Sequence, residues 1–301
     1  MLRTRRAHAI AASVSYPEPM SSAARTFTDS HGIRIHFDVH DVPQPKAIVQ
    51  LVHGVGEHAG RYRHVAQALN DAGYTVYADD HRGHGRTGME QHGGDVAMLG
   101  RLGPGGLRAT VAAVHQLTEL IREENPETPV VLLGHSWGSL MAQIILNSSA
   151  ADYAAAILTG TGYRMPGSVN SGDLNRRHKN LGTTGMEWLS RDVEVQQAFL
   201  DDPLTTSVPI AKLFGLVDGV RLYGRPAPDL PDIPVLIQVG GDDSVGGEKS
   251  ALKLVDAYHR RSGLTDVTLI VYPEARHEIF NELNRADVLA DTTAWLDEHL
   301  G

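Results

Sequence analysis

A serine between two glycines, Ser136 in the motif GHSWG (residues 134–138), is the side chain of this sequence best placed to act as a nucleophile. A serine hydroxyl is a poor nucleophile unless it is exposed, lies beside a base and faces N–H groups that stabilise developing negative charge. The apolar run 130–133 precedes the motif, and a helical run, 140–146, follows it. A sharp strand-to-helix turn, which the glycines permit, would present the serine at its tip.

A base and an acid for this serine follow two later strands. His277 comes after the apolar run 267–271, and histidine is the usual general base near neutral pH. Two carboxylates, Asp242 and Asp243, follow the run 235–239, and a carboxylate there could orient the imidazole. We favour Asp243 and interpret Asp242 as a loop-capping acid. The order Ser, Asp, His along the chain is the one found in α/β-hydrolases.

The transition state of acyl transfer also needs donors for an oxyanion. The loop 53–58 follows the apolar strand 47–52, and its free N–H groups could supply one donor, which we assign to Val55. The second is the N–H of Trp137, the residue after the nucleophile, which opens the helix. His53 precedes the turn of this loop, so we interpret it as a brace rather than a catalytic group.

These residues must be positioned by strands that alternate with helices. Two short runs, 25–28 and 33–39, form an N-terminal hairpin. The remaining predicted strands are 47–52, 74–78, 130–133, 154–159, 235–239 and 267–271. The predicted helices are 62–72, 107–124, 140–146, 248–261 and 278–300. This alternation predicts an α/β fold with a mostly parallel sheet, helices on both faces, and ligands bound at the carboxyl ends of the strands.

The alternation stops between residues 161 and 231. This stretch is rich in Gly, Pro, Asn and Arg and carries only short helical patterns, such as 185–189 and 193–200. We therefore predict one α/β domain, formed by residues 24–160 and 232–301, with residues 161–231 inserted as a cap.

Apolar side chains of the predicted cap could line a substrate pocket. The candidates for substrate binding are Trp188, Leu189, Phe214 and Leu216. The same side chains could instead pack the cap onto the sheet.

Composition excludes several classes of function. The net charge is −9, with 27 Lys+Arg against 36 Asp+Glu, so the chain lacks the basic surplus that a nucleic-acid partner requires. The absence of cysteine excludes disulfides and a thiol nucleophile. No apolar run reaches the roughly 18 residues of a membrane-spanning helix, and no helical histidine spacing suggests a metal. Residues 1–23 make a poor export signal, so we expect a disordered leader and a cytoplasmic protein.

Several motifs resemble the monoacylglycerol lipases and related bacterial lysophospholipase-like hydrolases. HGVGEHAGRY (residues 53–62) is similar to their HGxGEHxxRY segment, and DHRGHGR (80–86) is similar to their DHRGHGRS loop. GHSWG has tryptophan where these proteins usually have methionine, and HEIFNE (277–282) resembles the segment that holds their catalytic histidine. Ser190-Arg191-Asp192 and Asp202-Pro203-Leu204 also occur in the cap of bacterial members.

The resemblance implies the α/β-hydrolase fold and the assignments of Ser136, Asp243, His277, Val55 and Trp137 made above. It further implies hydrolysis of a fatty-acid monoester without a cofactor, and it is compatible with transient contact at a membrane surface. The cap is more polar and richer in glycine than an apolar lid, so short-chain or aromatic monoesters, such as phthalate monoesters, and lysophospholipids remain alternatives. A carbon–carbon bond hydrolase, a perhydrolase or a non-catalytic receptor with the same fold would also share these features.

Overall fold

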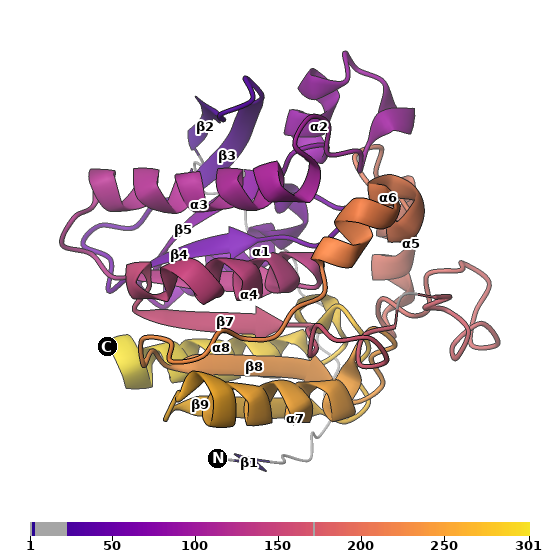
Figure 1. The fold of residues 1–301 in the computed structure, drawn as a ribbon. Helices are drawn as coiled ribbons and strands as arrows, with labels where there is room; N and C mark the ends of the chain where they lie inside the picture. The colour runs from indigo at the N-terminus through magenta and orange to yellow at the C-terminus, as the bar shows by residue number, and fades with distance from the viewer. Residues whose placement is uncertain (1, 4–22, 171) are drawn as a thin grey trace.

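The computed structural model describes residues 2–3, 23–170 and 172–301, and in this part of the chain a nine-stranded sheet forms the centre of the molecule (Figure 1). The strand order is β1-β9-β8-β7-β6-β4-β5-β3-β2. The hairpin β2–β3 and the pair β3–β5 are antiparallel, and the other neighbours are parallel. The strands are β1 (Leu2–Arg3), β2 (Ala23–Thr28), β3 (Arg34–His40), β4 (Ile48–Val52), β5 (Thr75–Asp80), β6 (Val130–His135), β7 (Ala155–Thr159), β8 (Val235–Gly240) and β9 (Val267–Tyr272).

Helices cover both faces of the sheet. In Figure 1, α3, α4 and α7 lie over one face, and α1 and α8 lie over the other. The α-helices are α1 (Arg63–Asp71), α2 (Gly85–Gln91), α3 (Gly106–Glu124), α4 (Trp137–Ser149), α5 (Val193–Asp201), α6 (Ile210–Arg221), α7 (Gly247–Ala257) and α8 (Arg285–Leu300). Short 3₁₀ turns occupy Ala59–Tyr62, Val96–Met98, Ala150–Asp152 and Ile279–Asn281, and a π-helical turn, Tyr258–Ser262, extends α7.

The core forms two layers because successive side chains of a strand point to opposite faces. In β4, Ile48 and Val52 pack into the layer shared with α3 and α4, whereas Val49 and Leu51 pack into the layer shared with α1 and α8. Every residue of β4 is buried, as expected for a strand covered on both sides. The predicted α/β class, with a mostly parallel sheet between two helical layers, is confirmed.

The predicted closing helix 278–300 is wrong at its start, because α8 begins only at Arg285. The residues before it form a 3₁₀ turn and a loop whose carboxylates have other partners. Glu278 pairs with Arg61, and Glu282 accepts hydrogen bonds from the side chain of Arg191 and the N–H of Arg276. These tertiary contacts outweigh the local helical pattern.

The segment between β7 and β8, residues 160–234, is here named the inserted segment. It contains α5 close to its predicted position, but residues 185–189 form turns rather than the predicted helical piece. It also contains α6, which the sequence pattern did not predict. Gly215 interrupts α6 with φ 66° and ψ −174°, and this break hides the helical periodicity. The predicted leader, 1–23, lies almost entirely outside the described residues.

Candidate active site

Ser136 lies on a tight turn between β6 and α4. Its backbone has φ 52° and ψ −124°, a conformation that a residue with a side chain rarely adopts and that stores strain. Hydrogen bonds hold the turn: the Ser136 N–H donates to the Thr159 carbonyl at 2.9 Å, and the Ser139 hydroxyl donates to the Ser136 carbonyl at 2.6 Å. Glycine is required beside it, because a Cβ on Gly138 would lie 2.1 Å from the Val52 carbonyl oxygen.

The three side chains predicted to work together lie in one hydrogen-bonded row. His277 Nε2 lies 2.7 Å from Ser136 Oγ. On the other side of the ring, Nδ1 lies 3.0 and 3.1 Å from the two carboxylate oxygens of Asp243. Asp243 and His277 are buried, whereas Ser136 is partly exposed. A serine that faces solvent and a base that faces a buried carboxylate can together transfer a proton from the hydroxyl.

The protonation of His277 is set by the charges around it. Burial lowers the pKa of His277, but the Asp243 carboxylate at 3.0 Å outweighs burial and raises the pKa above its ordinary value, assisted by Glu278 and Glu57. The ring of His135 lies 5.0 Å from that of His277. Burial, followed by the charge of His277, lowers the pKa of His135 to about 3, so His135 is neutral at pH 7 and adds no charge beside the base.

The loop predicted to supply an oxyanion donor lies against the serine. A Cβ built on Gly54 would lie 3.1 Å from Ser136 Cβ. Within the described residues, the N–H groups of Val55 and Trp137 donate to no protein acceptor, whereas the Gly54 N–H donates to Glu57 at 2.7 Å. These two free N–H groups, one in the loop that lies against the serine and one on the residue after it, are available to hold a negatively charged oxygen.

His53 supports the loop 53–58 through its ring nitrogens. Its Nδ1 lies 2.7 Å from the Gly54 carbonyl oxygen, and its Nε2 accepts the His81 N–H at 3.1 Å. The His53 and His81 rings stack at 3.8 Å. Burial, with smaller contributions from the neighbouring histidines, lowers the pKa of His53 well below its ordinary value, so the ring is neutral. The contacts are those of the brace that the sequence predicted.

A buried charge network, which the sequence reasoning missed, joins the two loops beside the serine. Arg61 Nη1 lies 2.7 Å from both Glu57 and Glu278, and the Tyr62 hydroxyl donates to Glu57 at 2.7 Å. Burial alone would raise the pKa of Glu278, but Arg61 outweighs it and lowers that pKa to about 2. Glu57 and Arg61 are four residues apart, which is the spacing of an ion pair on a helix. This spacing is the sequence pattern from which part of the network could have been predicted.

Asp242, the alternative acid, faces away from His277 and toward the inserted segment. Its carboxylate accepts from His178 Nε2 at 2.8 Å and from the guanidinium of Arg177. It therefore pairs with side chains of another segment instead of capping its own loop. Of the two adjacent aspartates, the structure brings only Asp243 to His277.

The four candidate substrate-binding residues have different environments. The rings of Trp188 and His277 lie 5.1 Å apart, and the Leu189 carbonyl accepts the Glu278 N–H at 2.7 Å. Phe214 is buried, with its ring 5.1 Å from that of Trp137. Leu216 is 84% exposed, because the break at Gly215 turns it away from this cluster. Trp188, Leu189 and Phe214 thus adjoin residues of the site, and Leu216 does not.

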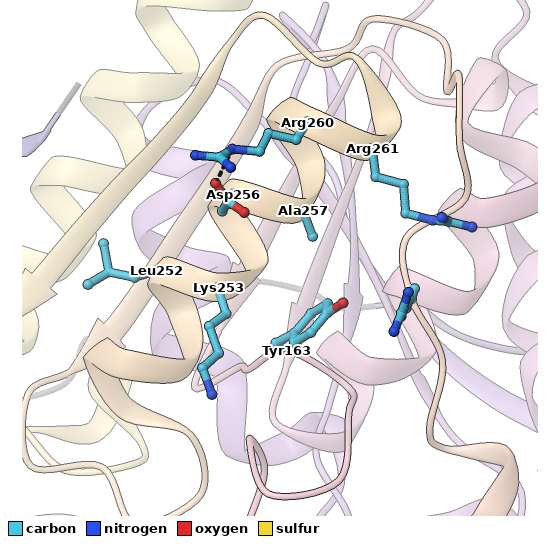
Figure 2. Close-up of a pocket in the computed structure, with 8 residues that line it drawn as sticks. Tyr163, Leu252, Lys253, Asp256, Ala257, Arg260 and Arg261 are labelled. Atoms are coloured by element: carbon cyan, nitrogen blue, oxygen red, sulfur yellow. Dashed lines mark ion pairs between the residues drawn. The ribbon is translucent and has the colours of Figure 1, made fainter.

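A separate hollow of about 540 Å³ lies against the outer side of α7 (Figure 2). Its charged groups are largely engaged: Arg260 pairs with Asp256 at 2.6 Å, Lys253 donates to Ser168 at 3.1 Å, and Arg261 donates to the Pro226 carbonyl at 2.7 Å. It shares no lining residue with the Ser136 site.

The described residues lack a metal cluster and a membrane-spanning helix. They contain no group of three or more His, Cys, Asp or Glu that could hold a metal ion. No helix among them has both the length and the apolar character needed to cross a bilayer.

A serine at a strained strand-to-helix turn, followed along the chain by an acid and a histidine at the ends of later parallel strands, defines the α/β-hydrolase class. Solved structures agree. A thermostable carboxyl esterase from Bacillus coagulans, in complex with glycerol, superimposes with a TM-score of 0.82 at 24% identity, covering 94% of this chain and 100% of that one.

Sequence comparison gives the family. Residues 43–284 match the family model described as serine aminopeptidase, S33. The monoacylglycerol lipase of Mycolicibacterium smegmatis is 32% identical over 289 residues, covering 91% of this chain and 97% of the relative. The human monoglyceride lipase is 26% identical, covering 84% and 83% of the two chains. The chain belongs to this S33 family of α/β-hydrolases and is a carboxylic ester hydrolase, as the sequence motifs predicted.

Proposed function

We propose that the protein hydrolyses carboxylic monoesters through an acyl-enzyme on Ser136, with His277 as the base and Asp243 as the acid that orients it. The observation that carries this proposal is the unbroken row from Ser136 Oγ to His277 at 2.7 Å and on to Asp243 at 3.0 Å. The hydrogen bond to Asp243 keeps the hydrogen of the imidazole on Nδ1, so that Nε2 is free to accept the serine proton.

The reaction proceeds in two steps. Ser136 Oγ attacks the ester carbonyl carbon while His277 Nε2 accepts the hydroxyl proton. The tetrahedral intermediate collapses, the bond to the alcohol oxygen breaks, and His277 donates its proton to the departing alcohol. A water molecule then gives a proton to His277 and attacks the acyl carbon. The bond between that carbon and Ser136 Oγ breaks, the acid leaves, and His277 returns the proton to Oγ.

We assign the oxyanion donors to the N–H groups of Val55 and Trp137. Within the described residues both are free of protein acceptors; Trp137 directly follows the serine, and Val55 follows Gly54, on which a Cβ would lie 3.1 Å from Ser136 Cβ. The Trp137 N–H also opens α4, where the helix dipole favours negative charge. Removal of one such donor typically lowers the rate at least about a hundredfold.

We propose a monoacylglycerol-like ester as the substrate, with the inserted segment acting as a cap. Two curated relatives are named for this activity. In Figure 1, α5 and α6 lie beyond the carboxyl ends of the strands. Ser136 directly follows β6, at the same end of the sheet. Exposed apolar side chains of α6, including Leu216, Val217 and Val220, would favour transient contact with aggregated lipid.

The alternative substrates are short-chain or aromatic monoesters and lysophospholipids. The glycine-rich and polar composition of residues 161–231 favours them over a long acyl chain. All the candidate esters require the same chemistry at Ser136, so the alternatives differ in pocket shape and not in mechanism.

Two measurements test the proposal. A fluorophosphonate should label the wild-type protein at Ser136, and Ser136→Ala should abolish the label; a persistent label on another residue would refute the nucleophile. Hydrolysis of monoacylglycerols, lysophospholipids and aromatic monoesters of graded chain length then separates the substrates. A maximum for monoacylglycerols supports the main assignment, whereas a maximum for short or aromatic esters supports the alternative.

A further inference from the structure

The two loops that carry Asp243 and His277 share one external support. We name them the acid loop, residues 240–246, and the histidine loop, residues 273–278. Both contact the same part of the inserted segment, Asn170 together with residues 175–190, which we name the clamp. His178, near the start of the clamp, contacts the acid loop, and Trp188 and Leu189, near the end of the clamp, contact the histidine loop.

On the acid loop, the clamp holds the residues on both sides of Asp243. His178 is buried, with Nε2 2.8 Å from the Asp242 carboxylate and Nδ1 3.2 Å from the Ser244 hydroxyl. Asn170 adds two hydrogen bonds, from its side chain to the Ser244 carbonyl and from its N–H to the Val245 carbonyl. One imidazole therefore spans the residues before and after the acid.

The contacts between the clamp and the acid loop affect the position of the Asp243 carboxylate. The Val245 N–H donates to Oδ1 of Asp243 at 2.7 Å, and the same oxygen lies 3.0 Å from His277 Nδ1. A shift of residues 244–245 therefore rotates the carboxylate relative to the imidazole. His178 sits where it prevents that shift.

The clamp also holds the histidine loop. The Trp188 carbonyl accepts the His277 N–H at 3.4 Å, and the Leu189 carbonyl accepts the Glu278 N–H at 2.7 Å. Within the clamp, the Asn175 carbonyl accepts the His178 N–H at 2.9 Å, and Oδ1 of Asn175 accepts the Trp188 N–H at 3.0 Å. The two ends of the clamp are thus tied together.

We propose that His178 is a positioning residue, which acts through Asp242 and Ser244 to keep Asp243 aligned with His277. The inference rests on the proposed function, because it assigns a support to the acid and base named there. It gives the inserted segment a role in aligning catalytic groups, besides any role in covering substrate. His178 itself touches neither the substrate nor the reacting atoms.

The test compares His178→Gln, Asp242→Asn and the double variant with the wild-type protein. The readouts are kcat and KM for a chromogenic short-chain ester, the rate of Ser136 labelling by a fluorophosphonate, and the pH profile of kcat/KM. Each single variant should lower kcat about tenfold with KM changed less than about twofold, because alignment of the acid is lost while substrate contacts stay. The double variant should lose little more than either single one, because the two side chains act through one contact.

The pH profile separates positioning from a merely structural effect. Asp243, Glu278 and Glu57 raise the pKa of His277, and His135 faces it as a neutral ring. A carboxylate that is less well aligned raises the pKa of His277 less, so the acid limb of kcat/KM should move to lower pH in both single variants. Loss of folded protein alone lowers activity at every pH and leaves the limb in place.

A matched control is His115→Gln, which breaks a His–Asp pair of the same 2.8 Å length between α3 and Asp152. It should leave kcat and the acid limb unchanged. Wild-type kcat and an unmoved limb in folded His178→Gln would overturn the inference. If that variant does not fold, Asp242→Asn, whose carboxylate is partly exposed, decides in the same way.

Fluorophosphonate labelling distinguishes failure of the role proposed for His178 from failure of the proposed function. Labelling of wild-type protein at a residue other than Ser136 removes the proposed function, and the inference with it. Equal labelling of Ser136 in the wild type and both single variants removes only the role of His178.

Discussion

Asp243→Asn removes a negative charge behind His277 and replaces one acceptor by a donor. Oδ1 of Asp243 accepts the Val245 N–H at 2.7 Å, so the asparagine oxygen must remain at that position. Its NH₂ group then occupies the place of Oδ2, 3.1 Å from His277 Nδ1. The retained oxygen still lies 3.0 Å from Nδ1 and can accept its hydrogen, but the NH₂ group beside it can donate to Nδ1 in the competing tautomer with hydrogen on Nε2, which cannot accept the proton of Ser136.

The expected loss of activity is large. A hydrogen bond to a charged group contributes about 1.5–3 kcal/mol, and the reversed tautomer removes the base in addition. The same change in a chymotrypsin-type triad lowers kcat about 10,000-fold, or about 5 kcal/mol of transition-state stabilisation. Asp242→Asn, which alters the adjacent carboxylate without touching His277, should lose only about tenfold.

The assay is kcat and kcat/KM for a chromogenic ester, with near-ultraviolet circular dichroism to verify that both variants are folded. Equal losses in the two variants would refute the choice of Asp243. A folded Asp243→Asn that keeps activity within about tenfold of wild type would refute the tautomer argument itself.

Two further predictions concern stability. Arg61→Met leaves the two buried carboxylates that it pairs with uncompensated, so the free energy of unfolding at pH 7 should fall by about 3–5 kcal/mol in urea titrations. In the wild type, the depressed pKa of Glu278 means that this carboxylate stabilises the fold above the pKa it has in the unfolded chain, and this stabilisation is lost as the pH falls toward about 2. In the variant, the free energy of unfolding should instead rise on acidification from pH 7, because protonation removes the uncompensated charges. A fall on acidification would contradict the assignment. Gly138→Ala places a Cβ 2.1 Å from the Val52 carbonyl oxygen and should therefore lower the melting temperature sharply. The control is Gly219→Ala on α6, where a Cβ meets open space and the change should be neutral or slightly stabilising. Similar effects of the two substitutions would refute the close approach at the turn.

The sequence was sufficient to predict the sheet and the neighbourhood of the site. Continuous apolar runs identified β4, β6 and β8, because strands buried on both faces need no alternation. Ser136 and His277 could be brought together because each follows a predicted strand of the parallel sheet, and the carboxyl ends of these strands meet at one edge. Their hydrogen bond at 2.7 Å is what the structure adds to that expectation.

Contacts that depend on distant parts of the chain could not be predicted. Arg61 and Glu278 are 217 positions apart, and His178 and Asp242 are 64 apart, so no local pattern connects them. The break at Gly215 similarly conceals α6, because a residue with φ 66° interrupts the periodicity on which helix prediction depends. In each case tertiary geometry supplied the missing information.

The position of the inserted segment also limits how such proteins can be recombined. It joins β7 to β8, two neighbouring strands whose pairing does not depend on the length between them, so a segment from a relative could be grafted without a change of register. The clamp makes that graft conditional, since residues 175–190 contact two loops that lie outside the graft, both after its end at β8. A productive chimera would therefore need residues 242–245 and 276–278 from the same parent as the segment.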